Sequence, residues 1–166
     1  MLFIFFISCK DDDDPAGSFS FGGNTYTLGK SFAQRKEVYD VSYWVLLVTS
    51  NGISYDAASE DFSGKGHGLE FGLLIENNDD PELPSGTYVN AYDEGLPYVD
   101  VGYVYLDLDG DSAADPVSEV DGTIQSAIIT IEKNGDSYSM NFTVVFESGE
   151  TLNGSYNGLV TPAVIK

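Results

Sequence analysis

The sequence predicts an all-β fold, and two features of the chain support that prediction. Aromatic residues make up 13% of the 166 residues and Gly occurs 18 times, which favours short strands joined by tight turns. Several segments also alternate apolar and polar residues, the pattern of a strand with one buried face. We expect about nine strands in an antiparallel β-sandwich, with a closed barrel as the alternative.

The clearest strand begins at Asp136, where the apolar residues fall on every second position. Upstream of it, Asn134-Gly135 suits the two positive-φ positions of a type I′ turn. A two-residue loop at these positions places Ile131 opposite Tyr138, and all the apolar side chains then share one face. The sequence therefore predicts a hairpin there.

Two further hairpins follow from the same test of register. A three-residue loop at 148–150 pairs Phe146 with Leu152, although Gly149 is then not at the loop position that most favours Gly. Near the start of the chain, a Gly23-Asn24 turn matches Phe21 with Tyr26. We expect a three-stranded meander at the C-terminal end and a separate hairpin at the N-terminal end.

Four strands are expected between these hairpins, at 37–49, 67–76, 87–92 and 98–108. The first is apolar on both faces, which suits a strand covered on both sides. The second should turn Leu69, Phe71, Leu73 and Ile75 inward. Only 31–37 and 56–61 are expected to form short helices. If the sheet closes, the barrel would be of the lipocalin kind.

The N-terminus consists of an apolar run, Met1 to Ile7, that ends at Ser8-Cys9. The run is too short for a membrane-spanning helix. It resembles the end of a bacterial lipoprotein signal, in which a small residue precedes the Cys that receives the lipid. The absence of a basic residue before the apolar run departs from that pattern and suggests a start codon assigned too late. The resemblance implies a lipid anchor on Cys9.

A charged segment follows this cysteine and consists of Lys10, Asp11, Asp12, Asp13 and Asp14. It resembles the export signal of surface lipoproteins of the Bacteroidota. Short segments at 19–26, 83–88 and 154–158 also resemble lipoproteins of that group, a likeness that implies an envelope role and no particular reaction. We therefore expect a signal segment at 1–8, a lipidated tether at 9–17 and one all-β domain at 18–166, held at the outer membrane and exposed at the cell surface.

The charge and the residue inventory exclude several functions. The chain has 27 acidic and 7 basic residues, and the resulting net charge of −20 would repel nucleic acid. A single His excludes a multi-His zinc site, the sequence has no nucleophile-elbow motif for a Ser-His-Asp triad, and its one Cys is the expected lipidation site, which leaves no Cys for a Cys-His pair. We expect no enzymatic activity. His67 is expected at the edge of a strand without a catalytic role.

One acidic loop has the residues that a cation site needs. Carboxylates alternate around Gly110, and calcium takes six to eight oxygen ligands. The loop resembles the Asp-x-Asp-Gly-Asp loops of calcium-binding repeats, but it lacks the EF-hand spacing. A calcium site would use Asp107, Asp109, Asp111 and Asp115, and the alternative is a solvated acidic turn. Within the loop, Ser112 resembles an O-glycosylation acceptor of the Bacteroidota.

Tyrosines near this loop suggest a ligand. Exposed tyrosine rings can stack on sugars, whereas buried ones would fill the core. The sequence therefore favours a binding module for glycans or other nutrients, and a structural or interaction lipoprotein without a small ligand is the alternative. The residues expected to stack on a ligand are Tyr92, Tyr98, Tyr103 and Tyr105.

Overall fold

The computed structural model describes residues 15–38, 41–56, 59, 61–76, 81–90, 97–108, 119–121 and 124–162. These residues form thirteen strands and no helix, so the all-β prediction is confirmed. The strands are β1 (Gly17–Phe21), β2 (Asn24–Leu28), β3 (Lys30–Val38), β4 (Val41–Thr49), β5 (Ile53–Asp56), β6 (Asp61–Gly64), β7 (Gly66–Glu76), β8 (Gly86–Val89), β9 (Tyr98–Leu108), β10 (Glu119–Asp121), β11 (Ile124–Asn134), β12 (Ser137–Phe146) and β13 (Thr151–Pro162).

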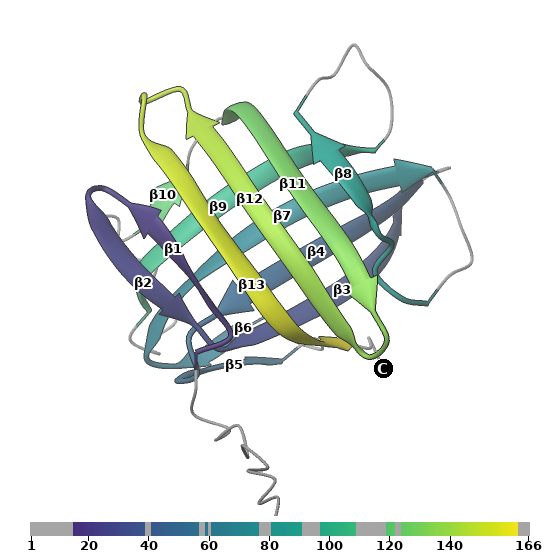
Figure 1. Ribbon diagram of the computed structural model, residues 1–166, viewed down its shortest axis with the longest axis horizontal. Helices are drawn as coiled ribbons and strands as arrows, with labels where there is room; N and C mark the ends of the chain where they lie inside the picture. The colour runs from purple at the N-terminus through teal and green to yellow at the C-terminus, as the bar shows by residue number, and fades with distance from the viewer. Residues whose placement is uncertain are drawn as a thin grey trace, which may run out of the picture.

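Eight of these strands close into a barrel, in the order β12-β11-β8-β9-β7-β4-β3-β13. In Figure 1, β13, β12, β11 and β8 form the wall nearer the viewer, and β9, β7, β4 and β3 cross behind them. The sandwich expectation is therefore wrong in its detail, and the closed alternative applies. Closure depends on the length of β13, which pairs antiparallel with β12 and, through Val160–Pro162, parallel with β3.

The barrel also departs from a simple up-and-down, lipocalin-like arrangement. Besides the parallel contact of β13 with β3, β8 meets β9 in parallel at Val89 and Tyr98. The β1–β2 hairpin extends the sheet beyond β13, and β10 adds to β9. Two parallel pairings therefore take part in closing the barrel, and β1, β2 and β10 extend the sheet beyond it.

The barrel interior is filled with side chains. Trp44, Phe71, Tyr88, Phe142 and Phe146 are all at least 98% buried and belong to one continuous core. Burying a large apolar side chain contributes roughly 1.5–3 kcal/mol, so this core accounts for much of the driving force for folding. The predicted inward residues of β7 all lie in the same core, which confirms the expected face of that strand.

The prediction that one strand is covered on both sides is confirmed for β4. Its inward residues enter the core, and its outward residues Val45 and Leu47 are also buried. The small β5–β6 hairpin covers this outer side, where Ile53 is fully buried and the hydroxyl of Tyr55 donates to Oε1 of Gln34 at 2.8 Å. A second, smaller apolar layer therefore lies outside the barrel.

The helix expected at 31–37 is wrong, because these residues form most of β3 and pair with β4 over its whole length. Ala33 points into the core and Phe32 outward, so the apolar residues are shared between two buried faces and show no simple alternation. At the other expected helix, Asp56 pairs with Asp61 as the ends of β5 and β6.

All three predicted hairpins form with the expected faces, but each register is shifted by two residues. The first turn is made by Gly22 and Gly23, with φ of 56° and 81°, so Phe21 pairs with Asn24. Two glycines accept the positive φ angles of this turn more readily than the expected Gly-Asn pair.

The two C-terminal turns show the same shift. In the β11–β12 turn Gly135 has φ of 64°, and Ile131 pairs with Met140 instead of Tyr138. In the β12–β13 loop the amide of Phe146 donates to the carbonyl of Glu150, which leaves Gly149, with φ of 86°, as the last loop residue. That position is the one at which a three-residue loop favours Gly.

Two rows of uncharged residues follow from the register of the strands in the wall that lies nearer the viewer in Figure 1. Each row runs across six strands, β2-β1-β13-β12-β11-β8, in continuous antiparallel register. We call these two rows the neutral face; one consists of Thr25, Ser20, Asn153, Thr143, Ile128 and Val89, and the other of Thr27, Ser18, Ser155, Asn141, Thr130 and Thr87.

Candidate functional site

Three of the predicted stacking tyrosines lie together on the outer side of the opposite wall. Tyr98, Tyr103 and Tyr105 all belong to β9, and all are partly exposed. They alternate with buried residues such as Val99 and Val104, which point into the core. The alternative that these rings fill the core is therefore wrong for these three residues.

Register brings a fourth tyrosine to the same surface. Tyr43 of β4 pairs with Leu74 of β7, and Leu74 pairs with Tyr98 of β9. Glu70 of β7 pairs with Tyr103 in the same way. We call this surface the tyrosine face; its members are Tyr43, Tyr98, Tyr103, Tyr105, Glu70 and Asp100.

The side chains of the tyrosine face are held by one another. The rings of Tyr103 and Tyr105 stack with centroids 6.3 Å apart and planes at 22°. The hydroxyl of Tyr105 donates to Oε2 of Glu70 at 2.8 Å. Because a stacked ring and a hydrogen-bonded hydroxyl both restrict rotation, this pair is ordered before any ligand arrives.

Burial and the acidic neighbours together raise the pKa of one tyrosine of this surface. Burial, and then the charges of Asp100 and Glu70 and the nearby hydroxyls of Tyr103 and Tyr98, raise the pKa of Tyr43 to about 12. The raised pKa keeps the Tyr43 hydroxyl protonated, and able to donate a hydrogen bond, to a higher pH than an exposed tyrosine. The tyrosine face thus offers aromatic rings, hydroxyl donors and carboxylate acceptors side by side.

On β7, a glycine lies between the two ends of this surface. Between the row of Tyr98 and the row of Tyr103, Gly72 occupies the central strand and pairs with Val45 and Val101. The two rows are four residues of β7 apart, or about 13 Å along the strand. Gly72 and its neighbour Val45 are both buried, so the two rows form separate parts of the surface.

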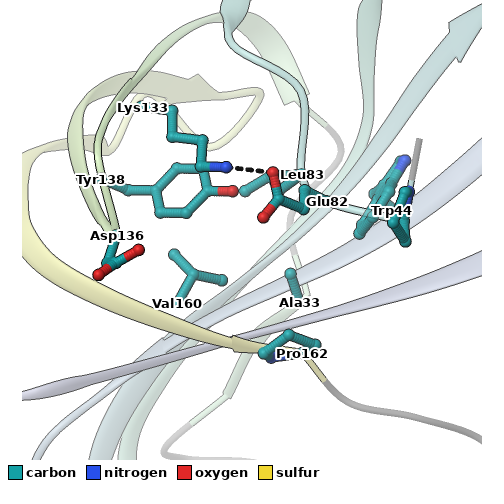
Figure 2. Close-up of a pocket in the computed structure, with 10 residues that line it drawn as sticks. Ala33, Trp44, Glu82, Leu83, Lys133, Asp136, Tyr138, Val160 and Pro162 are labelled. Carbon is teal, nitrogen blue, oxygen red and sulfur yellow. Dashed lines mark hydrogen bonds and ion pairs between the residues drawn. The ribbon is translucent and has the colours of Figure 1, made fainter.

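A separate pocket lies at the end of the barrel where β11 turns into β12. Its volume is about 110 Å³, and Figure 2 shows the ion pair of Lys133 with Glu82 beside the Tyr138 ring. The pocket is lined by Ala33, Trp44, Pro81, Glu82, Leu83, Lys133, Asp136, Tyr138, Val160 and Pro162.

The chemistry of this pocket suits only a small ligand. Trp44 and Tyr138 are 98% and 95% buried and form aromatic walls, and Trp44 Nε1 has no hydrogen-bond partner among the described residues. Binding pockets for drug-sized ligands are about 300–1,000 Å³, several times larger. The tyrosine face is therefore the stronger candidate for a ligand of several rings.

His67, for which no catalytic role was expected, joins the N-terminal hairpin to the barrel. Its Nε2 donates to the carbonyl oxygen of Thr27 at 2.6 Å, and its ring packs edge-on against Tyr26 and Phe19. The interaction covers part of the free edge of β2. These contacts help to hold the hairpin against the barrel.

Several predicted site residues fall outside the described residues, and the structure does not test them. They include the lipidation site, the export signal, one of the four tyrosines, the glycosylation site and most of the calcium loop: Cys9, Lys10, Asp11, Asp12, Asp13, Asp14, Tyr92, Asp109, Asp111, Ser112 and Asp115. Asp107 lies near the end of β9. Within the described ranges, no three His, Cys, Asp or Glu side chains gather as metal ligands.

Three members of the tyrosine face, Tyr43, Glu70 and Asp100, were missed by the sequence analysis. Tyr43 belongs to a strand that is apolar on both faces, so its outward position carried no polar signal. Glu70 was the informative residue, because it is a charged outward position in the otherwise apolar β7. Pairing β7 with both β4 and β9 would have placed Glu70 between the aromatic residues.

Searches among known protein families, curated proteins and solved structures give no match to this chain. None of the described segments is a helix long and apolar enough to cross a membrane.

Proposed function

We propose that the chain is a carbohydrate-binding module whose ligand lies on the tyrosine face. The observation that carries this proposal is the ordered pair of Tyr103 and Tyr105, stacked and tied to Glu70 on an outer surface of the barrel. Sugar rings present apolar C–H faces to aromatic rings and hydroxyls to carboxylates. The tyrosine face offers both kinds of group within one sheet.

The charges of the tyrosine face narrow the ligand class. Glu70 and Asp100 are both close enough to Tyr43 to raise its pKa, and the chain as a whole has a net charge of −20. Uronic or sulfated sugars would be repelled by these charges. The ligand we propose is therefore neutral or carries amino groups.

A glycan array followed by calorimetry tests the proposal. The chain from Lys10 onward keeps every described residue and should bind at least one neutral or amino-sugar polymer. Replacing both Tyr103 and Tyr105 by Ala removes two rings, each worth about 0.5–1.5 kcal/mol, so affinity should fall roughly 5- to 150-fold.

Two conservative variants serve as controls for that experiment. Tyr103→Phe keeps the ring and should bind like the unmodified chain. Glu70→Gln keeps the shape but removes the charge, so it should weaken binding of amino sugars more than of neutral ones. Absence of binding to all polymers on the array, or equal binding by the double Ala variant, contradicts the proposal.

We propose in addition that a lipid on Cys9 holds this module at the outer membrane, with the segment Lys10 to Asp14 directing it to the cell surface. Acyl chains contribute about 0.8 kcal/mol per buried CH₂, and one chain anchors only weakly, so the several chains of a lipoprotein are needed. Mass spectrometry of the native protein should find a triacylated or diacylated Cys9. An unmodified Cys9 in the mature protein contradicts the anchor.

A protease experiment on whole cells tests whether the segment directs the module to the cell surface. Replacing Lys10 to Asp14 by Ala should leave the anchor intact and remove access of external protease to the module in whole cells. Unchanged protease sensitivity contradicts a role of this segment in export.

A further inference from the structure

We infer that the pocket at the end of the barrel binds a small neutral molecule with a compact apolar body and one hydrogen-bond acceptor. Trp44 forms one wall of this pocket and supplies the donor. The inference does not depend on carbohydrate binding, because Trp44 belongs to the core inside the barrel and the tyrosine face lies on its outer side.

The indole of Trp44 is the first argument. Its side chain is 98% buried, yet Nε1 has no hydrogen-bond partner among the described residues. A buried Trp usually places its N–H against an acceptor, and a buried donor without one is destabilising. Because Trp44 lines a pocket, a molecule bound in that pocket can provide the acceptor.

The walls of the pocket are the second argument. The pocket lies at the parallel contact of β13 with β3, where Pro162 pairs with Ala33. The small side chain of Ala33 leaves space there that its neighbours do not fill. Val160 and the rings of Trp44 and Tyr138 complete a largely apolar lining (Figure 2). The body of the ligand should therefore be apolar.

The charges in the lining are the third argument. Lys133 forms an ion pair with Glu82, and Asp136 adds a second carboxylate. An anion would meet two carboxylates against one ammonium group, in a chain whose net charge is −20. An ammonium ion offers donors and no acceptor, so it would leave Nε1 of Trp44 unpaired. These charges and the free donor together favour a neutral ligand.

The volume of the pocket limits the size of the ligand. The pocket measures about 110 Å³. A closed apolar cavity of about 150 Å³ in another protein binds benzene. Glu82 and Lys133 are partly exposed, so this pocket opens to solvent and need not enclose a ring completely. We therefore expect a ligand of about six non-hydrogen atoms, bound with a dissociation constant on the order of millimolar.

Pyridine and benzene form a matched pair of probes, because the rings have nearly the same shape and only pyridine carries a nitrogen lone pair. Trp44 is the only Trp of the sequence, so its indole N–H gives a single resonance in a proton–nitrogen correlation spectrum of the labelled full chain. Pyridine, added at mildly alkaline pH where it is neutral, should move this resonance downfield to saturation. Benzene should bind at least about fivefold more weakly, because it leaves the donor unpaired.

Two variants that fill the pocket test the place of binding. Ala33→Leu fills it from β3 and Val160→Phe from β13, so pyridine should no longer shift the Trp44 resonance in either variant. Filling a cavity ordinarily preserves or raises stability, and thermal melts check that each variant folds. Ser54→Leu, at an exposed position of β5, is the control and should bind pyridine like the unmodified chain.

A third variant tests the donor. Trp44→Phe keeps an aromatic wall and removes the N–H, so ligand-observed NMR should find that it binds pyridine and benzene with equal affinity. A Trp44 resonance that pyridine leaves in place would mean that the pocket holds water only, which overturns the inference. Equal binding of the two probes by the unmodified chain, or normal binding of pyridine by a folded variant with a filled pocket, also overturns it. The glycan array tests the tyrosine face separately, so either proposal can fail without the other.

Discussion

Replacing Gly154 by Ala should destabilise the barrel more than most single methyl additions. Gly154 lies in β13, between Phe142 of β12 and Phe19 of β1. A Cβ at this position would meet the ring of Phe142 and would lie 2.7 Å from both Cβ of Phe19 and the carbonyl oxygen of Ser18. Real Cβ atoms essentially never approach other heavy atoms within 3.0 Å, so some neighbour must move.

The cost follows from which neighbours can move. The Phe142 ring already packs against Phe71 with centroids 5.7 Å apart, and Ser18 and Phe19 are fixed by the pairing of β1 with β13. Overpacking of a filled core costs about 1–3 kcal/mol, and a site with rigid neighbours belongs at the upper end of that range. For a domain of this size, a loss of about 2–3 kcal/mol lowers the melting temperature by roughly 4–12 °C.

Scanning calorimetry measures this loss, with Gly86→Ala as the matched control. Gly86 is also a strand residue, but the nearest atom to its Cβ would be Cε2 of Tyr88 at 3.7 Å, an ordinary contact. This control should melt at or slightly above the temperature of the unmodified chain, because Ala restricts the unfolded state. If Gly154→Ala melts within 2 °C of Gly86→Ala (a difference under about 1 kcal/mol), the reasoning about close packing between β1, β13 and β12 is refuted.

Three further predictions follow from particular side chains. Burial raises the pKa values of Tyr43 and Tyr156 to about 12. Because the unfolded chain loses these protons at lower pH than the folded chain, the free energy of unfolding should fall between pH 10 and 12. Urea unfolding measured against pH should show a shallower fall in the Tyr43→Phe and Tyr156→Phe variants. Replacing His67 by Ala removes the bond that ties β2 to the barrel, and hydrogen exchange in the β1–β2 hairpin should become faster while β12 stays protected. Calcium should raise the melting temperature by a few degrees if the acidic loop binds it at roughly 10⁻⁴ to 10⁻³ M, and equal melting with calcium and chelator, or a rise that persists in Asp109→Asn/Asp111→Asn, would exclude that site.

The hairpins show which part of a strand pairing can be predicted from sequence. Alternation of apolar residues determined the buried face correctly in all three hairpins, because a shift by one residue would expose the core. A shift by two residues preserves the face, so alternation cannot detect it. Register was decided instead by the glycines that accept positive φ, such as Gly23 and Gly149, and these turns were placed one residue away from their true positions.

The choice between sandwich and barrel depended on contacts that leave no local pattern. Closure requires the parallel pairing of Val160 with Ser31, which are far apart in sequence, and of Val89 with Tyr98, which are close in sequence but do not form a hairpin. The tyrosine face could be predicted only in part, because some of its members are brought together by strand pairing. Tyr103 and Tyr105 sit at alternate positions of one strand, whereas Tyr43 reaches them only through the pairing of β4, β7 and β9.

The double role of β13 has a consequence for how the chain acquires its structure. This strand pairs with its neighbour β12, but also with β1, where the hydroxyl of Ser20 donates to the carbonyl of Asn153 across 133 residues of sequence. Contacts between segments so far apart slow folding, because the entropy of closing a long loop is lost before the contacts form. Until β13 has been synthesised and docked, β1, β3 and β12 each keep an open edge that can pair with another chain. The nascent polypeptide therefore depends on protection from aggregation until about residue 162 is available, and a truncation before Thr151 should yield aggregates and not a smaller barrel.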